Sequence, residues 1–231
     1  MPTSAQRYFT PALFQFMREL QLNNDREWFN ENKHRYIKDM KEPALAFILD
    51  FGQHLDRISP HFRADPRANG GSLFRIYRDV RFAKDKSPYK THTGIYFKHL
   101  AGKDAHTPGF YLNLQPGHNW VGVGIWRPAG PTIKMLRDHV ATHPEKWQQA
   151  VENKAFAETF AVTGARLKRP PKGYDKDHPM IEVLKMKDFI AAAPLTQKQV
   201  TGKDFMKEFS GVCKAGSSLV KFVCEAINQP F

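Results

Sequence analysis

With 231 residues, of which 41% are hydrophobic and 13% aromatic, the chain is long and apolar enough to bury a core, and this excludes an intrinsically disordered protein. Its 35 Lys and Arg residues against 23 Asp and Glu give a net charge of +12, which favours anionic partners. No apolar run is long enough to span a bilayer, so we expect no membrane partner. The length is typical of one domain, which we place over residues 1–231.

The cysteines and the N-terminal stretch bear on localisation. Cys213 and Cys224 form no CxxC pair and are typical of small core residues in a reducing compartment. The stretch MPTSAQRYFTPALFQFM has neither a long apolar run nor a small-residue cleavage pattern, so we expect no signal peptide. Together these features predict a cytoplasmic protein.

The N-terminal quarter has helical periodicity. Thr10 and Pro11 are typical of a helix start, and apolar residues then follow at helical spacing to Leu20. A second helix is expected from Asn24, its predicted N-cap, and Pro43 is expected to break or kink it.

From Phe74 the period changes to two, which predicts a strand over residues 74–82 with one charged face. Its apolar row places Arg78 between Ile76 and Val80. The segments TGIYFKHL, GFYLNLQPG and WVGVGIWRP predict three further strands in an antiparallel meander. In the last two, the residues expected to face inward are Phe110, Leu112, Leu114, Val121, Val123 and Ile125.

After Pro131 the helical pattern returns, with a second short helix around Trp147. A basic, Pro-rich loop over residues 166–179 precedes a helix that carries Ile181 and Leu184. Residues 201–227 predict two short helices separated near Gly216. The order of helices, sheet and helices predicts an α+β fold, an antiparallel β-sheet flanked by N- and C-terminal helices.

Candidate site residues concentrate in FRIYRDVRFAKDKSPYKTH, at the end of a predicted strand and the start of a loop. A buried Arg78 would be either one half of a structural ion pair or a fork for carboxylate or phosphate. We call residues 75–90 the first basic cluster. The predicted ligand-binding residues are Arg75, Arg78, Arg81, Lys86 and Lys90, and the predicted catalytic residues are Asp79 and Tyr89.

Other motifs are weaker. Gly122 and Gly124 favour close approach either of a ligand or of a helix packed on the sheet, and Trp126-Arg127 is either an aromatic and cationic rim or ordinary packing. The GxG here lacks a third glycine, so it predicts no dinucleotide site, and no metal site or cofactor is expected from the scattered histidines.

Residues 166–176 form a second basic cluster with Arg166, Lys168, Arg169, Lys172 and Lys176. One alternative is a solvated, mobile loop. If the second cluster instead lies near the first, the two would make a groove that suits a phosphate backbone, with Tyr89 and Tyr174 stacking on bases.

The stretch RIYRDVRFAKDKSPYK closely resembles the signature R-x-x-R-D-x-R-F-x-x-x-K-x-x-Y of the DUF2461 family. The signature residues are Arg75, Arg78, Asp79, Arg81, Phe82, Lys86 and Tyr89. NNDREWFNENKHRY, GFYLNLQPG, VGVGIWRP and LKRPPKGYDKDHP resemble further blocks of the family in the same order. The resemblance implies that the unit is one whole domain, and it implies no reaction or ligand, because the family is a domain of unknown function.

Three hypotheses follow. The first is a pocket for an anionic small molecule, one that is phosphorylated, with or without catalysis at Asp79 and Tyr89. The second is a nucleic-acid-binding module without catalysis. The third is a structural ion-pair network that fixes the register of the sheet. The sequence leaves the choice of partner, the presence of a reaction and the oligomeric state open.

Overall fold

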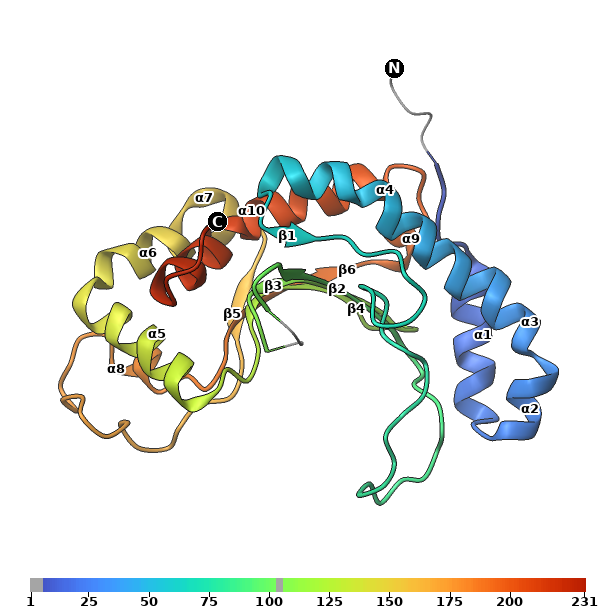
Figure 1. Ribbon diagram of the computed structural model, residues 1–231, viewed down its shortest axis with the longest axis horizontal. Coiled ribbons are helices and arrows are strands. Elements are labelled where there is room, and N and C mark those ends of the chain that lie inside the picture. Colours follow the sequence, from blue (N-terminus) through green and yellow to red (C-terminus); the bar gives the residue numbers. More distant parts are fainter. Residues whose placement is uncertain (1–5, 103–105) are drawn as a thin grey trace.

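The computed structural model describes residues 6–102 and 106–231, and residues 1–5 of the stretch used to predict the absence of a signal peptide lie outside it. Its described part forms a six-stranded antiparallel sheet in the order β1-β2-β3-β4-β6-β5, with helices before and after it in the chain (Figure 1). The predicted α+β class is therefore confirmed. The strands are β1 (Phe62–Arg63), β2 (Thr93–His99), β3 (Gly109–Leu114), β4 (Asn119–Ile125), β5 (Ala161–Thr163) and β6 (Phe189–Leu195).

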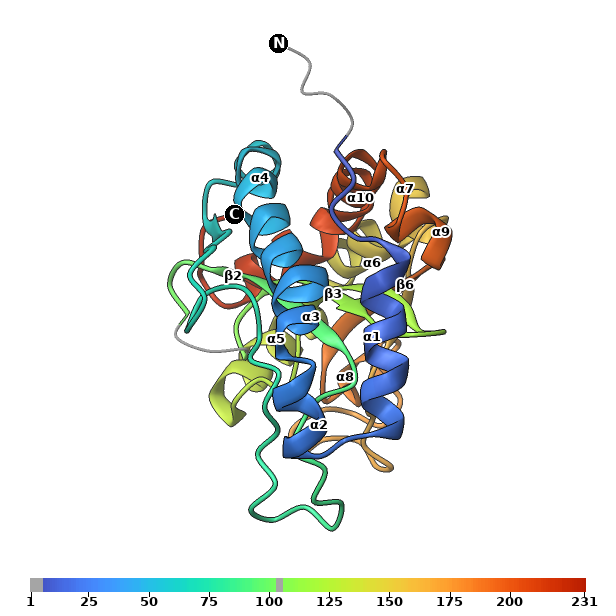
Figure 2. The same ribbon diagram turned by 90° about the vertical axis from the view of Figure 1, so that its right-hand side faces the viewer.

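The helices cover one face of the sheet and its two ends. In Figures 1 and 2, α4 and α10 lie over one face, α1 to α3 stand at one end, and α5 and α8 stand at the other. The helices are α1 (Pro11–Leu22), α2 (Arg26–Glu31), α3 (Lys33–Arg35), α4 (Glu42–Ile58), α5 (Gly130–Thr142), α6 (Pro144–Glu152), α7 (Lys154–Ala157), α8 (Ile181–Leu184), α9 (Gln197–Val200) and α10 (Phe205–Ala226). None of these helices in the described ranges is both long and apolar enough to cross a bilayer.

The core lies between the sheet and the two covering helices. All six residues predicted to face inward from β3 and β4 are buried. Phe51 of α4 links the two layers, because its ring centroid lies 4.6 Å from that of Phe97 on β2 and 4.8 Å from that of Phe209 on α10. Burial of this aromatic cluster supplies the main driving force for holding both helices on one face.

The N-terminal helices begin close to the predicted positions. Helix α1 starts at Pro11, as predicted. Asp25 caps α2, because its carboxylate accepts a hydrogen bond from the Trp28 backbone N–H at 2.9 Å, so the prediction of Asn24 as the N-cap is wrong. A π-helical turn (Tyr36–Lys41) precedes α4, and Pro43 lies in the first turn of α4, where a missing backbone donor is tolerated.

The predicted strand over residues 74–82 is wrong. This segment forms an irregular loop with isolated bridges, at Leu73 to Ile95 and at Tyr77 to Tyr89. Val80 is only half-buried and Phe82 is 96% exposed, so the expected apolar row does not extend beyond Ile76. The alternation of apolar and charged residues is present, but the segment has no neighbouring strand to pair with over its length.

In the C-terminal half, one prediction is wrong and one strand was not predicted. Helix α10 runs through Gly216 without a break, because this glycine allows the helix to approach β4: a β-carbon there would lie 2.7 Å from Cγ1 of Val123. The strand β6 was not predicted, since its sequence FIAAAPL has little apolar contrast and contains Pro194. Pro194 is tolerated because β5 pairs only with residues 190–192, so β6 is an edge at that position.

Candidate ligand-binding cleft

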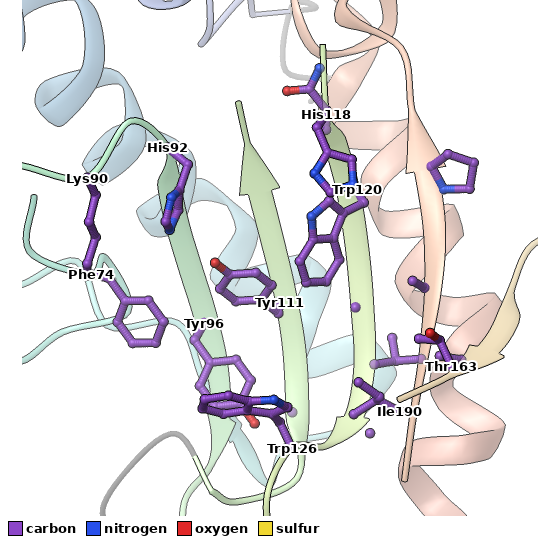
Figure 3. A pocket seen from close by; sticks show the side chains of 18 residues that line it. Phe74, Lys90, His92, Tyr96, Tyr111, His118, Trp120, Trp126, Thr163 and Ile190 are labelled. Atoms are coloured by element: carbon purple, nitrogen blue, oxygen red, sulfur yellow. The ribbon is translucent and has the colours of Figure 1, made fainter. Parts of the chain in front are cut away.

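A cleft of about 740 Å³ lies on the face of the sheet that α4 and α10 do not cover (Figure 3). It extends across the sheet from the segment before β2 to β5, and its volume is in the range of small-molecule sites, roughly 300–1,000 Å³. It is lined by Phe74, Lys90, His92, Tyr96, Gly109, Tyr111, His118, Asn119, Trp120, Gly122, Val123, Gly124, Trp126, Thr163, Ile190, Ala191, Ala192 and Pro194.

Aromatic rings form the floor of the cleft. Tyr96 on β2, Tyr111 on β3 and Trp120 on β4 all point to this face, since side chains alternate between the two faces of each strand. The ring centroids of Tyr96 and Tyr111 are 6.3 Å apart, and those of Tyr111 and Trp120 are 5.0 Å apart. Phe74 extends the row, at 6.1 Å from Tyr111 and 6.3 Å from Tyr96. The floor is therefore one continuous aromatic surface.

Glycines on the same face let these rings lie along the sheet. A β-carbon at Gly122 would lie 2.7 Å from Cζ3 of Trp120, and one at Gly109 would lie 2.7 Å from Cζ of Tyr96. Of the two alternatives for Gly122, helix packing does not apply, because α10 packs on the opposite face of β4. Gly122 faces the cleft, with the indole of Trp120 beside it.

The hydroxyls of both tyrosines in the floor donate hydrogen bonds within the protein. The Tyr96 hydroxyl donates to the backbone carbonyl of Thr107. Burial raises the pKa of Tyr111 to about 12, so this phenol is neutral throughout the physiological pH range. The buried side chain of Asn113 lies next to it and donates from Nδ2 to the carbonyl of His118 at 2.9 Å. What the tyrosines offer to a ligand is mainly their ring faces.

Lys90 supplies positive charge at one end of the floor. Its ammonium group donates to the carbonyl of Arg75 at 2.9 Å and lies 5.5 Å from the ring centroid of Phe74. Burial, and to a lesser degree the charge of Arg75, lowers the pKa of Lys90 below its usual value. No carboxylate in the described ranges pairs with Lys90, and no described residue lining the cleft is an Asp or Glu. The described residues that line the cleft thus leave the charge of Lys90 uncompensated.

His92 stands between Lys90 and the aromatic floor (Figure 3). Burial, together with the neighbouring charge of Lys90, lowers the pKa of His92 below its usual value. Its imidazole is therefore neutral at pH 7 and has one donor and one acceptor nitrogen. A neutral imidazole beside a cation can hydrogen-bond to a polar or anionic group that Lys90 attracts.

At the end of β4 the cleft has an aromatic and cationic rim, one of the two alternatives predicted for Trp126-Arg127. The Arg127 guanidinium lies 4.7 Å from the Trp126 ring centroid, and His106 stacks on the same indole at 5.4 Å. Arg127 has a positive φ of 46°, and Asp188 holds this conformation by accepting the Arg127 backbone N–H at 2.7 Å. The second oxygen of Asp188 accepts the N–H of Ala165 at 3.1 Å.

Most residues of the first basic cluster lie outside the cleft. Lys90 lines it, and Arg75 is an exposed neighbour whose charge acts on Lys90. The guanidinium of Arg78 pairs with Asp85 at 2.5 Å and donates to the carbonyl of Ser87 at 3.1 Å. Arg78 is thus half-buried as a result of contacts that close the loop on itself.

The two residues predicted to be catalytic are also outside the cleft. Asp79 is paired with Arg81 at 2.7 Å, and this contact lowers the pKa of the carboxyl to about 2, which makes it a weak base. Tyr89 is buried, and its ring stacks on Phe29 with centroids 4.0 Å apart. Burial raises the pKa of Tyr89. Lys86 donates to the carbonyl of Val80 at the exposed tip of the loop.

The second basic cluster follows β5, at the opposite edge of the sheet from β1 and β2, so the two clusters do not merge. Its five cations are exposed. Tyr174, which was predicted to stack on bases, instead donates its hydroxyl to Asp138 at 2.8 Å. Burial, followed by this hydrogen bond, raises the pKa of Tyr174 to about 12.

The residues that form the floor of the cleft were not predicted from the sequence. Tyr111 and Trp120 occupy positions that alternate with the predicted core residues of β3 and β4, and Tyr96 lies between the buried Ile95 and Phe97 of β2. The sequence contains one indication of this floor. Large aromatic residues occupy outward positions at which a strand that faces solvent carries polar residues. Among the described residues, no group of three His, Cys, Asp or Glu side chains is placed to hold a metal ion.

The comparisons with known proteins identify a family. Residues 12–222 match the model of a family described as conserved hypothetical protein (DUF2461). No curated protein matches the chain. Because the match covers most of the 231 residues, and because it agrees with the resemblance seen in the first basic cluster, the chain belongs to the DUF2461 family.

Proposed function

We propose that this protein binds an anionic organic molecule with a flat ring system in the cleft, with the ring on the aromatic floor and the anionic group at Lys90. The single observation that carries the proposal is a cation that no carboxylate of the described residues pairs with, at the end of a continuous aromatic floor. A phosphate is the anionic group that we favour, because Lys90 and His92 together offer several hydrogen-bond donors.

The ring system is supported by the composition of the floor. Tyr111 and Trp120 present ring faces to the cleft, and Ala192 and Pro194 of β6 add apolar surface beside them. Stacking of a planar group on such rings is worth about 1–3 kcal/mol for each ring by alanine substitution in nucleic-acid complexes. This surface selects for flat, weakly hydrated groups.

The proposal is for binding without an assigned reaction. Asp79 and Tyr89 are held in other contacts, and no described carboxylate lines the cleft to act as a general base. For the signature residue Arg78 we propose a structural role, because its ion pair with Asp85 closes the loop that leads to Lys90. In this view the first basic cluster positions the cation that binds the ligand.

The test is titration calorimetry with three phosphorylated probes and their dephosphorylated forms: AMP with adenosine, UMP with uridine, and FMN with riboflavin. Lys90→Gln should weaken binding of the phosphorylated probe that binds best by about tenfold or more, because a hydrogen bond to a charged group is worth about 1.5–3 kcal/mol. The same substitution should leave binding of the dephosphorylated form unchanged.

Two further variants complete the test. Trp120→Ala should weaken binding of both the phosphorylated and the dephosphorylated probe, because it removes ring surface that both would use. Lys207→Gln is the matched control, because Lys207 is exposed on α10 over the opposite face of the sheet, and it should leave both affinities unchanged. Failure of all three phosphorylated probes to bind, or equal loss in Lys90→Gln and Lys207→Gln, would overturn the proposal.

A further inference from the structure

We propose that the ligand of the cleft is a segment of single-stranded nucleic acid, with successive bases on the aromatic floor and its phosphates on the two basic clusters. This inference rests on the proposed function and names the class of ligand. It is carried by three observations: the extent of the floor, the course of the cleft across the sheet, and the placement of cations at both of its ends.

The aromatic floor is larger than one base needs. Phe74, Tyr96, Tyr111 and Trp120 form one array with neighbouring centroids 5.0–6.3 Å apart. Trp126, just after the end of β4, adds another ring beside Tyr96, and it is 44% exposed (Figure 3). Sheets that bind single strands use this arrangement, since every base has a face that can stack on an aromatic ring whatever its sequence.

The cleft runs across the strands from one edge region of the sheet to the other. Lys90 lies in the segment that enters β2, whereas Thr163 lies on the edge strand β5. Between β2 and β5 lie β3, β4 and β6, and at the usual spacing of about 4.8 Å between neighbouring strands this course measures roughly 19 Å. Such a length accommodates several stacked units better than a single ring.

Both ends of this course carry exposed cations. The first basic cluster leads into the cleft at Lys90, and in Figure 1 it projects from the same side of the sheet as the second, which follows β5. In the described ranges, none of the five cations of the second cluster forms an ion pair. Asp175 and Asp177 are the acidic residues within that loop, which therefore keeps a net positive charge.

A repeated phosphate accounts for both clusters. One phosphate beside a stacked base would engage Lys90 and leave the second cluster without a role, whereas a backbone with one phosphate for each base can reach both. A duplex would not suit the floor, because its base faces are already stacked on each other. The net charge of +12 adds long-range attraction for the same polyanion.

The experiment is fluorescence anisotropy with labelled single-stranded oligouridylate of about 12 nucleotides, within the usual range of such sites, at roughly 50 and 200 mM salt. UMP is titrated in parallel by calorimetry. The decisive variant is the double charge reversal Lys168→Glu with Arg169→Glu in the second cluster. Its control, Lys203→Glu with Lys207→Glu, changes the net charge equally but lies at and near the start of α10.

We expect the oligomer to bind more tightly than UMP, and we expect its affinity to fall steeply as the salt concentration rises. The double reversal in the second cluster should lower the affinity for the oligomer by tenfold or more and leave the affinity for UMP unchanged. The control should have a much smaller effect on the affinity for the oligomer. Trp120→Ala should weaken both ligands, because both would use the floor.

The outcomes separate this inference from the proposed function. If the oligomer binds no more tightly than UMP, or if the two double reversals have equal effects, the inference of a polymeric ligand is overturned. The proposal of a ligand the size of a mononucleotide would then still stand. If a duplex of equal length binds as tightly as the single strand, single-strand recognition is overturned. If Trp120→Ala leaves the affinity for the oligomer unchanged but lowers the affinity for UMP, the oligomer does not bind in the cleft and this inference alone is overturned. If it leaves both affinities unchanged, both proposals are overturned.

Discussion

His99 is held in one neutral tautomer by its two hydrogen bonds. The Ala101 backbone N–H donates to Nδ1 at 3.2 Å, so the proton lies on Nε2, which donates to the carbonyl of Pro230 at 2.9 Å. Burial lowers the pKa of His99, and the hydrogen bond to Pro230 offsets this only in part. His61, which stacks on His99 at 6.1 Å, lowers it further. Protonation of Nδ1 would remove the acceptor for Ala101.

This geometry predicts a loss of stability in acid. The unfolded state binds a proton at His99 near the usual pKa of about 6.5, whereas the folded state binds it only at lower pH, so the free energy of unfolding falls as the pH falls below that value. His99→Gln should therefore show a smaller decrease in Tm between about pH 7.5 and about pH 5.5 than the unmodified protein, as measured by circular dichroism.

In His99→Gln, the decrease in Tm on acidification should become smaller but should not disappear, because burial also lowers the pKa values of His54, His92 and His139. The exposed His34 on α3 provides the control, and His34→Gln should keep the full decrease. Equal decreases in both variants would contradict the assignment of this effect to His99.

At the scale of the element, α10 carries two glycines with opposite surroundings. A β-carbon at Gly216 would lie 2.7 Å from Val123 and 3.0 Å from Phe160, whereas one at Gly211 would meet nothing within 4 Å. Gly211→Ala should raise the free energy of unfolding by up to about 1 kcal/mol through helix propensity. Gly216→Ala should lower it by about 1–3 kcal/mol through overpacking. Urea denaturation measures both, and a gain of stability in Gly216→Ala would show that the contact between helix and sheet is looser than described.

Asn24 connects the α1–α2 corner to the loop that carries Lys90. Its Nδ2 donates to the carbonyl of Tyr89 at 3.0 Å, and its Oδ1 accepts the N–H of Tyr89 at 3.0 Å, as a neighbouring strand would. Asn24→Ala leaves both backbone groups of a buried residue without partners, so it should lower the free energy of unfolding by about 1–3 kcal/mol.

The same substitution should weaken ligand binding at Lys90, because that residue follows Tyr89 directly. Asn30→Ala on α2 is the control: its side chain is exposed and it should change neither quantity. Thermal denaturation and the titrations described above provide the two measurements. An unchanged Tm in Asn24→Ala would show that the loop is positioned by the stacking of Tyr89 on Phe29 instead.

The errors at this scale have physical causes. The alternation in residues 74–82 depends on side chains, but a strand also needs a partner, and the backbone of Arg78 pairs instead with that of Pro88 in the same loop. Glycine is typical of a break between helices, yet Gly216 lies within α10 at the point where the helix packs closely on β4. Both features depend on what lies opposite in space, and periodicity contains no such information.

At the scale of the whole molecule, the sequence predicted the fold class, the family, three strands and the buried face of β3 and β4. Those features depend on local periodicity or on a contiguous motif. The cleft depends on the register of five strands, one of which is β6, whose sequence pattern is weak. The sequence therefore did not predict that the residues lining the cleft lie together. The cationic signature drew attention to residues 75–90, of which Lys90 lines the cleft.

The order of the strands also has a consequence for folding on the ribosome. Strands β2, β3 and β4 follow one another closely in the chain, whereas β6, the partner of β4, is synthesised only after α5 to α8 and β5. Because distant pairings form slowly, β4 remains an unpaired edge during that interval. Its sequence, NWVGVGI, has glycine at positions 122 and 124, and glycine weakens strand pairing. Gly122, which leaves room for the ring of Trp120, should therefore act together with Gly124 to make this unpaired edge a poor template for aggregation.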